Sequence, residues 1–188
     1  MANSLKALFP ALGRILGQTP AALYAHQRTF VNAGLLESTP GRGPGSGVRA
    51  APETLAEFLI ATITLASLAE NVHFAKAIAR AVPGGGKCQL TSAATFKDAF
   101  AAILADKALT ERVNEIRVTI NGGYAQIIYD GSSSDLQLGL AKPAKLTRHP
   151  KTSVFVGKIA KPGLSIEVSI SADIVRKLAG VIKEVNIA

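Results

Sequence analysis

Hydrophobic positions recur with two different periods along the chain of 188 residues. As far as about residue 109 they recur every three or four positions, which is the period of a helix with one buried face. From residue 110 they alternate with polar positions, as in Ile116, Val118 and Ile120, which is the period of a strand. The pattern predicts an α+β protein in which most helices precede the sheet. The predicted helices cover residues 4–9, 10–16, 20–33, 54–69, 71–82 and 91–109.

The pattern in the C-terminal part of the chain predicts an antiparallel sheet with a packed helix. Asn121-Gly122-Gly123 is a hairpin turn signal, after which residues 124–129 return beside the first strand. The alternation over residues 164–171 predicts a strand with one buried face, and Ser171 can cap a final helix over residues 172–185. Two further strands are predicted over residues 136–140 and 154–159.

A stop signal and a start signal for helices lie within four residues near the N-terminus. Gly17 can take the left-handed conformation that ends a helix without steric cost. Thr19 can cap the next helix, and Pro20 suits its first position, where no backbone donor is needed. We therefore expect two short helices joined by a tight turn.

The second of these helices has a face of small residues that also carries an arginine. Leu23 and Phe30 lie on its inward stripe. On the opposite face, small side chains permit close approach to a DNA groove, and an arginine can bind a guanine edge or a phosphate. The alternative is an ordinary amphipathic helix in a small helical domain. The candidate DNA contacts from this helix and its cap are Thr19, Ala21, Tyr24, Ala25 and Arg28, with Gln27 at the margin.

A glycine-rich loop follows over residues 39–47, and we expect residues 35–38 and 48–50 to pair as short strands around it. Arg42 lies in the loop and Arg49 at its base. A basic side chain on a loop with no packing role suits a phosphate or minor-groove contact, so both arginines join the candidate set. The alternative for this loop is a linker.

The two helices, the exit Ala33-Gly34-Leu35-Leu36 and the glycine-rich loop with its arginines resemble the winged helix-turn-helix transcription regulators, in the broad sense that includes the MarR-like and PadR-like families. The resemblance covers about the first third of the chain. It implies that residues 20–28 enter the major groove and that Arg42 lies in or near the minor groove. These regulators have a full helix before the two. Here that helix is either abbreviated, or the helix after Pro52 supplies its packing.

The composition fits a polyanionic partner. The formal net charge is +8, and residues 1–51 hold five basic residues against one acid. A single cysteine, Cys88, excludes an internal disulfide and suits a reducing cytoplasm. The N-terminus has no signal-peptide pattern, and the most apolar run, Phe58 to Ala69, is too short to span a bilayer.

No group of residues with a pattern for catalysis, a metal or a cofactor stands out, and we expect a protein that is not an enzyme. The three histidines lie in three different segments and share no ligand spacing with acids or Cys88. The stretch Gly84-Gly85-Gly86-Lys87 lacks the spacing of a phosphate loop and the serine or threonine that must follow its lysine.

A second basic stretch begins near residue 142 and is mostly loop, because it contains Pro143 and Pro150. It is either a solubilising surface loop or a second phosphate-contacting patch that extends the DNA footprint. The candidates for that patch are Lys142, Lys145, Arg148 and Lys151.

The sequence thus predicts a DNA-binding domain over residues 1–51, connecting helices over 52–82, a linker over 83–90 and an α+β domain over 91–188. We expect a sequence-specific regulator of transcription, a repressor that acts as a homodimer on double-stranded DNA in the cytoplasm, associated with the nucleoid. One alternative is a replication or partition factor of a mobile element, and another is a protein-interaction module that does not bind DNA.

Overall fold

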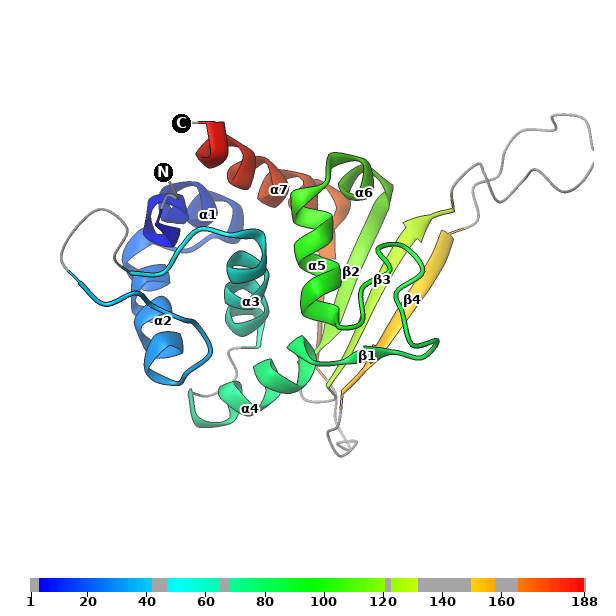
Figure 1. Ribbon diagram of the computed structural model, residues 1–188, viewed down its shortest axis with the longest axis horizontal. Coiled ribbons are helices and arrows are strands. Elements are labelled where there is room, and N and C mark those ends of the chain that lie inside the picture. The colour runs from blue at the N-terminus through cyan, green and yellow to red at the C-terminus, as the bar shows by residue number, and fades with distance from the viewer. Residues whose placement is uncertain are drawn as a thin grey trace, which may run out of the picture.

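The computed structural model describes residues 4–41, 47–64, 68–120, 123–131, 150–157 and 166–187. Within these ranges the chain has seven α-helices, a short 3-10 helix and one five-stranded antiparallel sheet (Figure 1). The predicted α+β class is confirmed. The helices α1–α4 gather at one end of the molecule and the sheet lies at the other.

The N-terminal helices begin and end where the turn residues predict. The 3-10 helix η1 (Leu5–Leu8) runs into α1 (Phe9–Leu16), and α2 (Pro20–Asn32) follows after three residues. Gly17 ends α1 in the left-handed conformation with φ of 67°, and the amide of Gln18 donates to the carbonyl of Gly13 at 3.0 Å. The Thr19 hydroxyl caps α2 by accepting from the amide of Ala22 at 3.1 Å. The tight turn is confirmed.

The long helix predicted over residues 54–69 is wrong at its C-terminal end. Helix α3 (Pro52–Ile63) ends before Thr64, and α4 (Leu68–Ala79) begins at Leu68 instead of residue 71. The hydroxyl of Thr62 donates to the carbonyl of Phe58, and that of Thr64 donates to the carbonyl of Ile60. Threonine hydroxyls that bond to the preceding turn compete with the backbone donors that would continue a helix. Hydrophobic periodicity alone does not register this competition.

The middle of helix α3 is buried within the single chain. Phe58, Leu59, Ile60 and Ala61 are all fully or almost fully buried, and four consecutive helical residues span the whole circumference. The Phe58 ring stacks on Phe9 at 5.5 Å and meets Phe30 edge-on at 5.8 Å between ring centroids. On its other side α3 packs along α5 (Phe96–Ala105). The apolar circumference of α3 is therefore satisfied inside the chain, without a second copy.

The sheet has the strand order β1-β4-β3-β2-β5, and all neighbours are antiparallel. Strands β2 (Val113–Thr119) and β3 (Tyr124–Asp130) form the predicted hairpin. The predicted strand over residues 154–159 is shifted, since β4 covers Pro150–Val156, while β5 (Glu167–Ser171) falls inside the predicted 164–171. The predicted strand over residues 136–140 lies outside the described residues.

A single helix predicted over residues 91–109 is two helices. Thr95 caps α5 by accepting from the amide of Asp98, so α5 begins five residues later than the pattern indicates. Asp106 interrupts the run, because its carboxylate accepts from the amide of Ala108 and starts α6 (Lys107–Arg112). The final helix α7 (Ala172–Ile187) is confirmed and begins directly after β5.

One face of the sheet is covered by helices α5, α6 and α7 (Figure 1). Ile116, Ile127 and Phe155 lie on that face and are fully buried, and Phe155 meets Phe96 of α5 at 5.3 Å between ring centroids. No described element covers the opposite face, where residues alternate with the buried ones.

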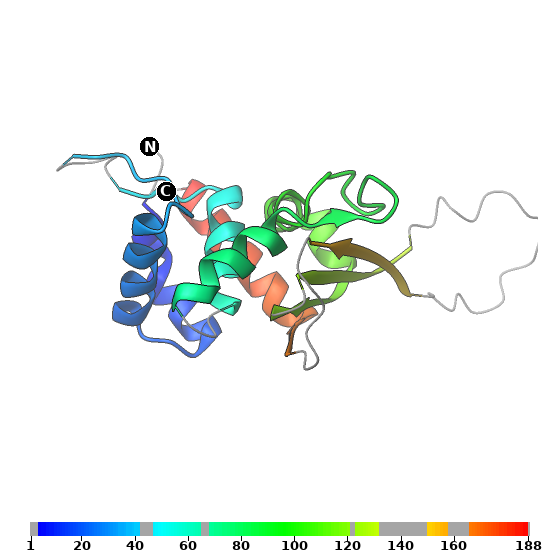
Figure 2. The ribbon, with the colours of Figure 1, turned by 90° about the horizontal axis from the view of Figure 1, so that it is seen from below.

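The helical part and the sheet share one hydrophobic core. Helix α7 leaves the sheet and packs against α1, so the chain's last helix contacts its first (Figure 2). In the segment 83–90, predicted as a linker, Pro83 belongs to the edge strand β1 (Val82–Pro83), and Cys88 and Leu90 are buried. The parts of the chain before and after residue 91 pack against each other, through contacts of α5 with α3 and of α7 with α1.

Gly13 provides a test of the turn. A Cβ built at Gly13 would lie 2.5 Å from the backbone carbonyl oxygen of Gln18, so Gly13→Ala must push the turn away from α1. We expect the substitution to lower the free energy of unfolding by about 1–3 kcal/mol, as overpacking does. Denaturant unfolding followed by circular dichroism measures this.

The matched comparison is Gly180→Ala in α7, where the added Cβ meets nothing within 4 Å. There the gain in helix propensity predicts a stability increase of about 0.5–1 kcal/mol. Equal effects of the two substitutions would contradict the close approach at Gly13.

Candidate functional site

The exposed face of α2 carries residues that the sequence analysis predicts as DNA contacts. Ala21, Tyr24, Ala25 and Arg28 are all exposed, and the Tyr24 side chain is 41% exposed. Leu23 and Phe30 face the core with 0% and 1% exposure. The predicted division of α2 into an inward stripe and an exposed small-residue face is confirmed.

Gln27 is more deeply placed than the sequence suggested. It is only 8% exposed, and its Oε1 atom has no hydrogen-bond partner among the described residues. His26 lies half-buried beside Phe30, and burial lowers its pKa below the usual value. His26 is therefore mainly neutral at pH 7 and adds little positive charge to this part of α2.

The pairing of residues 35–38 with 48–50 is wrong. Leu35 and Leu36 are buried, and both of their amides donate to the carbonyl of Phe30, so this segment still belongs to the turn that ends α2. The chain first pairs at Thr39, which exchanges two backbone hydrogen bonds with Gly47 at 3.0 and 2.7 Å. This bridge closes the glycine-rich loop. Arg42 lies outside the described residues.

The strand partner of Arg49 is the N-terminus. Ser4 and Arg49 form an antiparallel bridge, and the Leu5 amide donates to the carbonyl of Val48 at 2.8 Å. This pairing holds η1 against the base of the loop. Arg49 itself is exposed, as expected for a phosphate contact.

The same pairing brings Lys6 to the α2 face. Its Nζ atom lies 4.9 Å from the centroid of the Tyr24 ring, in a cation–π contact. In the sequence, Lys6 is one of the basic residues of segment 1–51, and no motif there assigns it to the site. The only sequence signal was that charge, because the contact depends on pairing across more than forty residues.

A groove of about 270 Å³ lies between α2, η1 and the base of the loop. Lys6, Tyr24, Gln27 and Arg28 line it together with Val48. Its charged lining residues are Lys6 and Arg28, and no acid is among the described residues that form its walls. We call it the α2 groove. Two cations, an exposed aromatic ring and a primary amide can bind a phosphate or the polar edge of a base.

The remaining candidates are Thr19 at the cap of α2 and the residues of the second basic stretch. The Thr19 oxygen is used by the cap, although its hydroxyl hydrogen can still be donated. Lys151 is exposed on β4, and α2 and β4 lie at opposite ends of the long axis in both views (Figures 1 and 2). Lys151 therefore does not adjoin the α2 face. Lys142, Lys145 and Arg148 lie outside the described residues.

Within the described ranges, no group of three or more His, Cys, Asp or Glu side chains is placed to hold a metal ion. Cys88 is buried as a free thiol. None of the helices described here is long and apolar enough to cross a membrane.

No protein-family model, no curated protein and no solved structure matched the chain. The resemblance to winged helix-turn-helix regulators therefore depends on the residues and geometry of this chain alone.

Proposed function

We propose that the protein is a sequence-specific, double-stranded DNA-binding regulator of transcription, a repressor that acts in the cytoplasm on the nucleoid. The observation that carries the proposal is the α2 groove, where Lys6 and Arg28 flank Tyr24 on the exposed face of a capped helix that follows a tight turn. In this proposal α1 and α2 act as the helix-turn-helix, and α3 packs behind them through Phe58.

The residue types on α2 suit the major groove. Ala21 and Ala25 add little bulk, so the helix axis can come close to the base edges. Arg28 lies one turn beyond Tyr24 on the same face and can reach guanine O6 and N7 with two hydrogen bonds. Lys6 and Arg49 lie on the segments beside this face, where they would contact phosphates and fix the orientation of α2.

Arg28→Ala tests base reading. We expect it to weaken binding to a duplex selected from a random pool by about 1–3 kcal/mol, because one bidentate base contact is lost. Binding to duplex of random sequence should hardly change. Fluorescence anisotropy with both duplexes measures the difference.

The control is Arg176→Ala, which removes an exposed arginine from α7 without touching the α2 groove. Equal losses on selected and random duplex for Arg28→Ala would show that this arginine contacts only phosphate.

Lys6→Ala tests the proposed phosphate contact of this residue. We expect weaker binding to every duplex, and the slope of log affinity against log salt should become shallower by roughly 0.9, the value for one phosphate contact. Titrations at several salt concentrations give the slope. Lys107→Ala, on the exposed face of α6, is the matched control and should leave it unchanged. An unaltered slope for Lys6→Ala would remove this residue from the interface.

We also propose a homodimer, because one helix-turn-helix contacts a single half-site and regulators gain specificity by pairing two. The sheet face that no described element covers supports this assignment. Val82 and Val156 are neighbours in the register of β1 and β4 and are 54% and 53% exposed. Sedimentation of the full chain should show a dimer and Val156→Asp should shift it to monomer. A monomeric wild-type chain would contradict the proposal.

Nuclease footprinting on genomic fragments separates this function from its alternatives. One or two short palindromic sites near a promoter support the regulator. An array of direct repeats would favour a replication or partition factor, and no protected site would favour a protein-interaction module.

A further inference from the structure

A second pocket of about 200 Å³ lies where α3, α4 and α5 meet the end of α2. We call it the junction pocket. It is separate from the α2 groove and shares no lining residue with it. Its walls come from Gly34 after α2, Glu57 of α3, Lys76 and Arg80 at the end of α4, and the first turn of α5. The pocket thus joins the helical part of the chain to the part that contains the sheet.

Three cations line the junction pocket. Lys76 and Arg80 are four residues apart, and the Arg80 amide donates to the carbonyl of Lys76, which places both side chains on the same side of the last turn of α4. Lys97 enters from α5. An arginine with two lysines is a combination that binds phosphate groups well, because the guanidinium can donate to two phosphate oxygens at once.

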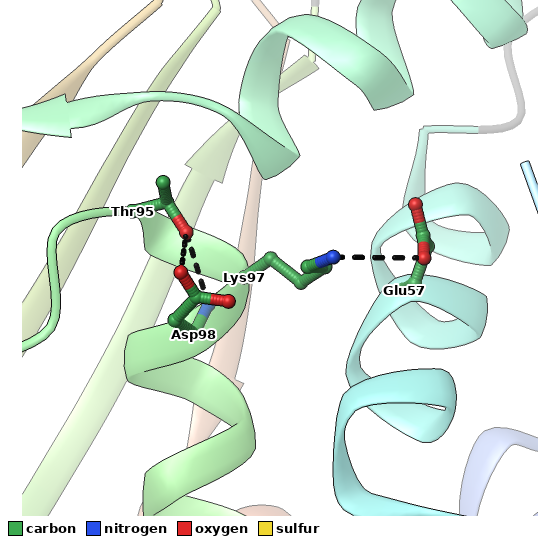
Figure 3. A network of polar contacts seen from close by, with 4 residues as sticks. All are labelled: Glu57, Thr95, Lys97 and Asp98. Carbon is green, nitrogen blue, oxygen red and sulfur yellow. Dashed lines mark hydrogen bonds and ion pairs between the residues drawn. The ribbon is translucent and has the colours of Figure 1, made fainter.

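The two acids in the walls already have partners. The Asp98 Oδ2 atom accepts from the Thr95 hydroxyl at 2.7 Å, and the Asp98 amide donates to that hydroxyl oxygen in return (Figure 3). Glu57 faces Lys97, whose Nζ atom reaches across from α5 to within 3.9 Å of Oε2 (Figure 3). Among the described residues, neither Lys76 nor Arg80 has a carboxylate within ion-pair distance.

The Glu57 and Lys97 side of the junction pocket is partly withdrawn from water, since the two side chains are 27% and 32% exposed. Burial raises the pKa of Glu57 and Glu37 adds to this rise, while Lys97, Arg80 and Lys76 act in the opposite direction. Partial desolvation strengthens any interaction between the cations and a ligand that enters, because the local dielectric is lower than in bulk water. The first turn of α5 adds the positive end of a helix dipole.

We propose that the junction pocket binds a small phosphate-bearing molecule from solution. Arg80 and Lys76 make the main contacts with its phosphate group, and Lys97 makes a third. The volume admits a phosphate group with a small substituent and excludes a drug-sized ligand. A bound ligand would tie α4 to α5 beside Gly34, directly after α2. An effect of this ligand on DNA binding rests additionally on the proposed function.

The test uses inorganic phosphate as the probe and the full chain without DNA. Phosphate is added at constant ionic strength, with chloride as the balancing anion, and the midpoint of thermal unfolding is followed. The expected result is a saturable rise of roughly 2–4 °C, which corresponds to about 1 kcal/mol of stabilisation for a chain of this size. No rise beyond that in chloride alone would overturn the proposal.

Arg80→Gln and Lys107→Gln are the matched variants. Both replace an exposed basic residue, but Lys107 lies on α6, away from the junction pocket. Arg80→Gln should abolish the phosphate-dependent rise and Lys107→Gln should retain it. A full rise in Arg80→Gln would overturn the assignment.

The affinity of the Arg80→Gln variant for DNA, measured without added phosphate, distinguishes two sources of the phosphate group: a free ligand and the DNA backbone. An unchanged affinity supports a free ligand. A reduced affinity together with no phosphate-dependent rise in the wild type would mean that Arg80 contacts the DNA backbone instead. Because the thermal measurement contains no DNA, its failure is distinct from a failure of the proposed function.

Discussion

The burial of the apolar middle of α3 is the constraint on which the rest of the structure depends. Its apolar side chains are covered by Phe9 of α1, by α2 and α4, and by α5. The contacts of Phe58 with Phe9 and Phe30 fix the two N-terminal helices relative to each other. Replacing Phe58 would therefore disturb α2 as much as α3, although the Phe58 side chain is itself fully buried.

This arrangement explains why the exposed face of α2 is available for a partner. Leu23 and Phe30 form the buried face of α2 and provide its contacts with the core. The small residues and Arg28 on the opposite face therefore have no packing role. The backbone pairing of Ser4 with Arg49 then places Lys6 over Tyr24 and completes a groove with two cations. On its other side, α3 contributes Glu57 to the junction pocket, so the helix that supports α2 through Phe58 also lines the second proposed site.

Local signals in the sequence predicted local structure well, as at Gly17, Thr19 and Pro20, where each residue suits a specific position of the turn. The predicted helix ends were wrong where a side chain forms hydrogen bonds with backbone groups of the helix, as Thr62, Thr64 and Asp106 do. The strand pairing around the glycine-rich loop failed because burial of Leu35 and Leu36 outweighs their strand propensity. Lys6 and the junction pocket require contacts between distant segments, and hydrophobic periodicity carries no information about these.

The central claim is that the α2 face binds double-stranded DNA. Amide chemical-shift mapping of the full chain, titrated with a duplex selected from a random pool, tests it most directly. We expect the largest shifts at Ala21, Tyr24, Ala25, Arg28 and Lys6, with little change in β2 and β3. Shifts confined to the sheet, or none at saturating duplex, would contradict it.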